Sequence, residues 1–151
     1  LVAALAVGAA GCGATARTTA AQTRAFPTLT SAIATFTTLD HGKDADSALT
    51  VQLLRINGEL GAEMHTVGTE FDDRASIPPF AFSVSGPFTT ADVETGRVRL
   101  RLTPDGDDDF TFDLHMTLRF SDGTTQNFAW RSIRLDHQGP ERVLTLAGAR
   151  T

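Results

Sequence analysis

The sequence predicts an all-β domain, an antiparallel β-sandwich of about eight strands. Apolar and polar residues alternate with a period of two over much of the chain, which is the pattern of strands with one buried face. Turn-forming pairs such as Asn57-Gly58 and Gly139-Pro140 separate the alternating runs. Ten phenylalanines and no tyrosine supply core side chains that need no buried hydroxyl partner.

Seven of the expected strands are short, and Asn57-Gly58 between two apolar runs is a strong hairpin signal. Only residues 91–95 suggest a helical turn. The short strands are expected at residues 33–39, 49–56, 60–67, 80–84, 98–102, 128–135 and 143–147.

The longest alternating run predicts the central strand of the core. A helix would spread its apolar residues around the circumference, whereas a strand places them all on one face. We therefore expect this face to point inward and Asp113, His115 and Arg119 to point toward solvent. The inward residues are Phe110, Phe112, Leu114, Met116, Leu118 and Phe120.

The first residues of the chain predict a membrane anchor. Residues 1–10 are small and apolar, too few to span a bilayer but of the length of a signal-peptide hydrophobic region. They lead to Ala9-Ala10-Gly11-Cys12, which resembles a bacterial lipobox, and Cys12 is the only cysteine. The resemblance implies a thioether-linked diacylglycerol on Cys12, usually with an added acyl chain such as palmitate. A buried cysteine beside a short apolar helix is the alternative.

These features divide the chain into three parts. We expect residues 1–12 to be a signal-peptide remnant, residues 13–28 a flexible tether, and residues 29–151 the sandwich domain. Because neither a methionine nor a basic segment precedes Leu1, the printed chain is expected to begin within the signal peptide. The lipobox implies an extracytoplasmic location, lipid-anchored to a bacterial cell envelope.

Three acidic loops are candidates for a calcium site, at residues 40–47, 70–73 and 105–109. Ca²⁺ takes six to eight oxygen ligands, which flexible aspartate-rich loops can supply if they meet at one end of the sandwich. The later bidentate glutamate of an EF-hand is missing, so that motif is excluded. The alternative is that these loops are exposed turns whose aspartates cap nearby backbone. The candidate ligands are Asp40, Asp44, Asp46, Asp105, Asp107 and Asp109.

Parts of the chain resemble PLAT (lipoxygenase-homology) domains, relatives of C2 domains. The segment Asp46-Ser47-Ala48-Leu49-Thr50-Val51 resembles the start of that family's second strand. Residues 98–102 followed by Asp108-Asp109-Phe110-Thr111-Phe112-Asp113 resemble its strand, acidic loop and aromatic strand, with Phe110 where tryptophan is common. Phe128-Ala129-Trp130 is similar to a late aromatic segment of the family. The resemblance covers about residues 31–136 and implies an eight-stranded, noncatalytic module that binds lipid or protein, sometimes with Ca²⁺.

Charge and residue spacing argue against other functions. A net charge of -5 argues against nucleic-acid binding, which needs a basic surface. No serine lies in a Gly-x-Ser-x-Gly elbow, so we predict that the domain is not an enzyme. No two histidines have the close spacing of a metal-binding pair, although a zinc site assembled through space is the alternative. The histidines are His41, His65, His115 and His137.

Trp130 and a stripe of three arginines each have two interpretations. Trp130 is expected in the core, and an exposed tryptophan that stacks on a sugar or lies at a membrane interface is the alternative. Arg97, Arg99 and Arg101 form a stripe that we expect to face acidic side chains on a neighbouring strand, with recognition of an anion as the alternative.

The preferred interpretation is a lipid-anchored, noncatalytic binding module at the cell envelope, with a protein, lipid or glycan as its ligand. A structural or assembly partner without a small ligand is the second interpretation, and a large exposed apolar patch would favour it. A small envelope hydrolase is the third, and a deep pocket holding a histidine and two carboxylates would favour it.

Overall fold

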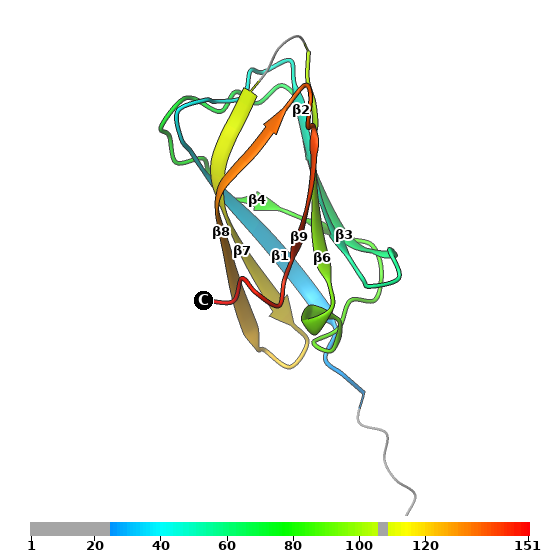
Figure 1. Cartoon of the computed structure of the whole chain (residues 1–151). Coiled ribbons are helices and arrows are strands. Elements are labelled where there is room, and N and C mark those ends of the chain that lie inside the picture. Colours follow the sequence, from blue (N-terminus) through cyan, green and yellow to red (C-terminus); the bar gives the residue numbers. More distant parts are fainter. Residues whose placement is uncertain (1–24, 106–108) are drawn as a thin grey trace, which may run out of the picture.

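The computed structural model describes residues 25–105 and 109–151, which form an antiparallel β-sandwich (Figure 1). The predicted fold class is confirmed. The one helical element of the described residues is a 3₁₀ turn, η1 (Asp92–Glu94), within the segment where the sequence suggests it. Among the sequence-predicted sites, Cys12 and Asp107 lie outside the described residues.

Nine strands of the described chain form two sheets in which every pair of neighbours is antiparallel. One sheet has the order β4-β1-β7-β8 and the other β5-β3-β2-β6-β9. The strands are β1 (Leu29–Thr38), β2 (Ala48–Leu54), β3 (Leu60–Thr66), β4 (Phe80–Ala81), β5 (Ser83–Val84), β6 (Arg97–Thr103), β7 (Asp109–Phe120), β8 (Thr125–Asp136) and β9 (Glu141–Thr145).

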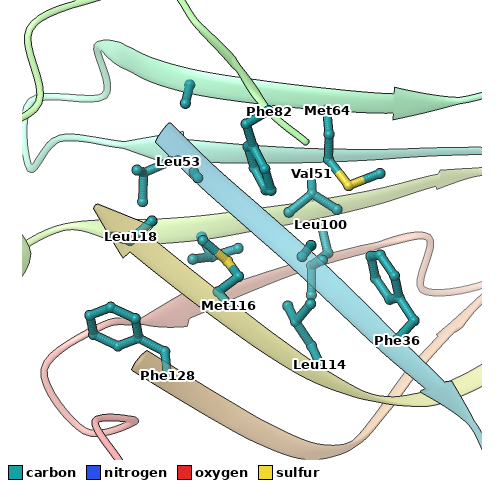
Figure 2. Packing of buried hydrophobic residues seen from close by; sticks show 14 of the residues in the cluster. Phe36, Val51, Leu53, Met64, Phe82, Leu100, Leu114, Met116, Leu118 and Phe128 are labelled. Carbon is teal, nitrogen blue, oxygen red and sulfur yellow. The ribbon is translucent and has the colours of Figure 1, made fainter. Parts of the chain in front are cut away.

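The core lies between the two sheets, and β7 supplies its longest row of side chains. All six apolar residues that the alternation assigns to the inner face are buried, which confirms that prediction. His115 and Arg119 are exposed and Asp113 is half-buried. Figure 2 shows Leu114 and Met116 among the side chains that the facing sheet contributes, such as Leu100.

The prediction of a single strand at residues 80–84 is wrong. The segment forms two short strands, β4 and β5, which lie in different sheets. Phe80–Ala81 pairs with β1, whereas Ser83–Val84 pairs with β3. Phe82 lies at the crossing: its side chain is buried and its N–H donates to the carbonyl of Ala32 at 2.9 Å. The chain therefore changes sheets at this residue, which raises the strand count above the expected eight.

The chain after β9 closes one side of the sandwich. The N–H of Ala129 donates to the carbonyl of Ala149, and the N–H of Thr151 donates to that of Asn127. The indole N–H of Trp130 donates to the carbonyl of Thr145 at 3.3 Å, across from β8 to β9. Trp130 is half-buried and stacks on Phe128, so it packs against the core from the edge rather than lying within it.

The two ends of the sandwich differ in what they carry. At the end where the chain enters β1, the N–H of Ser121 donates to the carbonyl of Thr28. The loops that join β1 to β2, β3 to β4 and β6 to β7 lie at the other end (Figure 1). β1 has ten residues, so the two ends are about 30 Å apart at the usual rise of a strand. We call them the N-terminal end and the acidic end.

Candidate functional site

The first and third acidic loops lie side by side where the structure describes them. The backbone N–H of Asp105 donates to the hydroxyl of Ser47 at 2.9 Å, and the N–H of Thr111 donates to the carbonyl of His41 at 3.0 Å. Sequence alone could not establish this contact, because it depends on how the strands pair.

The second acidic loop joins the first through a short backbone bridge. Lys43 and Phe71 exchange N–H···O=C bonds of 3.0 Å and 2.8 Å, and the N–H of Gly42 donates to Oδ1 of Asp73 at 2.6 Å. A Cβ atom at Gly42 would lie 2.0 Å from the carbonyl oxygen of Phe71, so only glycine permits this approach. All three acidic loops therefore contribute to one end of the sandwich.

Lys43, the only lysine of the chain, is fully buried within this acidic end. Its Nζ donates to the backbone carbonyls of Asp44 and Ser47 at 2.6 Å and 2.5 Å. The same atom lies 5.4 Å from the centroid of the Phe71 ring, a cation–π arrangement. The acidic end thus encloses a cation that belongs to the chain itself.

Two of the predicted calcium ligands form ion pairs with arginines. Asp40 accepts from Nε and Nη2 of Arg74 at 3.1 Å and 2.9 Å. Asp109 accepts a bidentate pair of bonds from Arg134 at 3.0 Å and 2.8 Å. The pair of Asp40 with Arg74 is largely exposed and that of Asp109 with Arg134 is partly exposed, so neither is expected to contribute much to stability. Their oxygens nevertheless have a positive partner close by.

The remaining predicted ligands are placed differently. Asp44, Asp46 and Asp105 are exposed. Asp44 lines a cavity of about 280 Å³ together with residues of the second loop. Its other lining residues are Gly42, Glu70, Phe71, Asp72 and Asp73.

Across residues 25–105 and 109–151, no group of three or more histidine, cysteine, aspartate or glutamate side chains is arranged to hold a metal ion. Asp107, which the sequence includes among the candidate ligands, lies outside those ranges. Calcium binding therefore stays a prediction of the sequence.

The roles of three cations at this end, Lys43, Arg74 and Arg134, were not predicted from the sequence. A lysine between acidic residues in a loop has the pattern of a solvated turn, and nothing in the alternation marks it as buried. Arg134 pairs with Asp109 because β7 and β8 are antiparallel neighbours, which place Arg134 opposite Thr111. Arg74 has a left-handed backbone, with φ of 54°, in the loop that brings it to Asp40.

The pKa of Asp136 is lowered by hydrogen bonds within its own turn. The backbone N–H of Gly139 has the largest effect, a smaller contribution of burial opposes it, and the N–H of Gln138 and the charge of Arg134 also lower the pKa. These contacts close the turn through which the chain passes from β8 in one sheet to β9 in the other. The lowered pKa of Asp136 is therefore explained by the hydrogen bonds of this turn.

A second group with a lowered pKa lies at the N-terminal end, in η1. Partial burial raises the pKa of Asp92, but hydrogen bonds from Thr89 and Arg55 outweigh it and hold the pKa below its usual value. Oδ2 accepts from both the N–H and the hydroxyl of Thr89 at 2.8 Å, and Oδ1 accepts from Arg55 Nε at 3.1 Å. The hydrogen bond with Asp92 in turn raises the pKa of Arg55.

A larger cavity, of about 890 Å³, lies at the N-terminal end. Phe26, Pro27, Thr90 and Gln126 are among its lining residues. Its lining holds one carboxylate, Asp122, and no histidine. The histidine with two carboxylates that would favour a small hydrolase is therefore not found in this lining.

No protein-family model matches the chain, and no curated protein matches it. The fold and the loops alone define the class of this protein, an antiparallel β-sandwich whose acidic end is formed by three loops. Among the described residues there is also no helix with the length and apolar character needed to cross a membrane.

Proposed function

We propose that this chain is a lipid-anchored, extracytoplasmic, noncatalytic binding module that Cys12 holds at a bacterial cell envelope. The observation that carries the proposal is the polarity of the sandwich. The chain enters β1 at one end, and the three acidic loops gather at the opposite end. An anchor that precedes β1 leaves the acidic end directed away from the membrane, where it can meet a ligand.

The site geometry supports a binding role over a catalytic one. The shifted pKa values of Asp92 and Asp136 arise from hydrogen bonds that close a 3₁₀ turn and the turn between β8 and β9. Neither side chain lines the two cavities described above. The resemblance of residues 31–136 to PLAT domains, which are usually noncatalytic, is part of the same proposal.

The proposal does not require calcium. Lys43, Arg74 and Arg134 already bring positive charge to the carboxylates and carbonyls of the acidic end. An envelope protein, lipid or glycan is the class of ligand that we propose for this end.

Membrane fractionation of a Cys12→Ser variant tests the anchor. The unmodified chain should sediment with the membranes of a bacterial host, because several acyl chains give stable anchoring. Cys12→Ser should move the chain to the soluble fraction or block its processing, whereas the neighbouring change Thr15→Ser should leave its distribution unaltered. If Cys12→Ser stays with the membranes and is processed normally, the proposed anchor is wrong.

A further inference from the structure

Strand β6 carries three arginines on the outer face of the five-stranded sheet. Arg97, Arg99 and Arg101 alternate with the buried Val98, Leu100 and Leu102. Alternate residues of a strand are about 6.6 Å apart, so the stripe is about 13 Å long. Arg97 and Arg101 are exposed, and Arg99 is half-buried.

The acidic partners that the sequence analysis expects beside this stripe are absent for Arg97 and Arg99. Only Arg101 has an acidic residue in register on β9, and none of the ion pairs in the described part of the chain involves any of the three arginines. The residues in register with Arg97, Arg99 and Arg101 on β9 are Thr145, Val143 and Glu141, and on β2 they are Leu54, Gln52 and Thr50.

The central guanidinium is fixed in place by an uncharged neighbour. Nε of Arg99 donates to Oε1 of Gln52 at 2.8 Å, and Nη2 donates to the same oxygen. The amide nitrogen of Gln52 donates in turn to Oε2 of Glu63 on β3. Arg99 is therefore oriented without being neutralised by direct contact with a carboxylate.

From this arrangement we infer that the stripe binds a linear polyphosphate, a polymer whose phosphate groups follow one another along β6. Arg97, Arg99 and Arg101 lie in a row and do not converge on one point, so a ligand that contacts all three carries its anions in series. The planar fork of arginine suits phosphate and sulfate oxygens.

The neighbouring carboxylates favour a polymer over an anionic membrane surface. Glu141 on β9 and Glu63 on β3 lie on either side of the stripe and limit the positive surface to a narrow band. A planar array of anions would meet these carboxylates, whereas a chain lying along β6 would avoid them. The inference does not depend on Cys12 or on the acidic end, so it can fail separately from the proposed function.

Binding of inorganic polyphosphate to the full chain, followed at several salt concentrations, tests the inference. The double variant Arg97→Gln/Arg101→Gln removes the two exposed members and keeps the contact between Arg99 and Gln52. The matched control, Arg119→Gln/Arg131→Gln, makes the same change in net charge with exposed residues of the four-stranded sheet. Melting curves should show that both variants fold, because exposed substitutions of this kind change stability little.

The expected result is salt-dependent binding that the stripe variant weakens at least about tenfold at low salt and the control largely preserves. The dependence of log affinity on log salt should also become less steep by roughly one to two in the stripe variant. Absence of polyphosphate binding to the unmodified chain, or equal losses in both variants, would overturn the inference. So would binding to anionic phospholipid vesicles without binding to polyphosphate, since that result assigns the stripe to a membrane surface.

Discussion

At the scale of single residues, Asp92 links the chain before η1 to the β2–β3 hairpin. Its two carboxylate oxygens accept from Thr89 and Arg55. These bonds favour the charged form of the side chain, which is why its pKa in the folded state lies below the ordinary value of 3.8. Stability from this group is fully present above that value and is lost as the pH falls through the folded pKa.

The variant Asp92→Asn tests this role. It should lower the free energy of unfolding by about 1–3 kcal/mol at pH 7, because the bonds to Thr89 and Arg55 lose their charged acceptor. The difference from the unmodified chain should shrink below about pH 4, where the aspartate of the unfolded chain becomes protonated, and should vanish once the pH falls below the lowered pKa of the folded state. Urea unfolding at both pH values measures it, with the exposed Asp46→Asn as the control. A loss of the same size at pH 3 and pH 7 would contradict the charge-based explanation.

Lys43 shows where residue-scale prediction from the sequence stops. The acidic loops are recognisable as turns from the sequence, and the calcium hypothesis depends on their meeting at one end. The identity of the buried cation was not recognisable, because it depends on carbonyls of Asp44 and Ser47 turning inward around the ammonium. Arginine partners such as Arg134 depend in the same way on strand register rather than on local pattern.

At the scale of elements, the length of an alternating run decided how well a strand could be predicted. β7 has twelve residues of strict alternation, and its inner face was predictable residue by residue. The segment at residues 80–84 is too short for its pattern to reveal two sheets, since the change occurs at the single residue Phe82. The partners of β4 and β5 depend on where the chain crosses from one sheet to the other, which the sequence pattern of a five-residue segment does not show.

The pair Leu118→Ala and Arg119→Ala tests the assigned faces of β7. Leu118 is fully buried, so its truncation should cost roughly 2–5 kcal/mol through lost transfer energy and the cavity left behind. Arg119 is exposed on the opposite face, and its truncation should change the free energy of unfolding by less than about 0.5 kcal/mol. Equal effects of the two changes in urea unfolding would refute the assignment.

At the scale of the whole molecule, charge is distributed unevenly over a chain with a net charge of -5. Three acidic loops contribute to the acidic end, whereas the arginine stripe lies on the outer face of the five-stranded sheet. Lys43, Arg74 and Arg134 offset part of the repulsion between the carboxylates of the acidic end. This distribution is the reason why we propose different ligands for the two regions.

Titration with calcium and magnesium tests whether the acidic end needs an added metal. Because Lys43, Arg74 and Arg134 already provide counter-charge, we expect tens of millimolar Ca²⁺ and Mg²⁺ to raise the melting temperature by small and equal amounts through screening. A shift specific to Ca²⁺ would contradict this expectation and would establish a calcium site at the acidic loops, since Mg²⁺ demands a tighter octahedral shell.

The central claim, that the acidic end points away from an anchored N-terminus, can be tested by energy transfer to the bilayer. In the lipidated chain the thioether occupies the sulfur of Cys12, so one introduced cysteine gives a unique label. Donors at Thr125→Cys, at the N-terminal end, and at Ala45→Cys, at the acidic end, would be compared in vesicles that carry a head-group acceptor. The account predicts stronger transfer from position 125 than from position 45. Equal transfer from both positions, or stronger transfer from position 45, would contradict it.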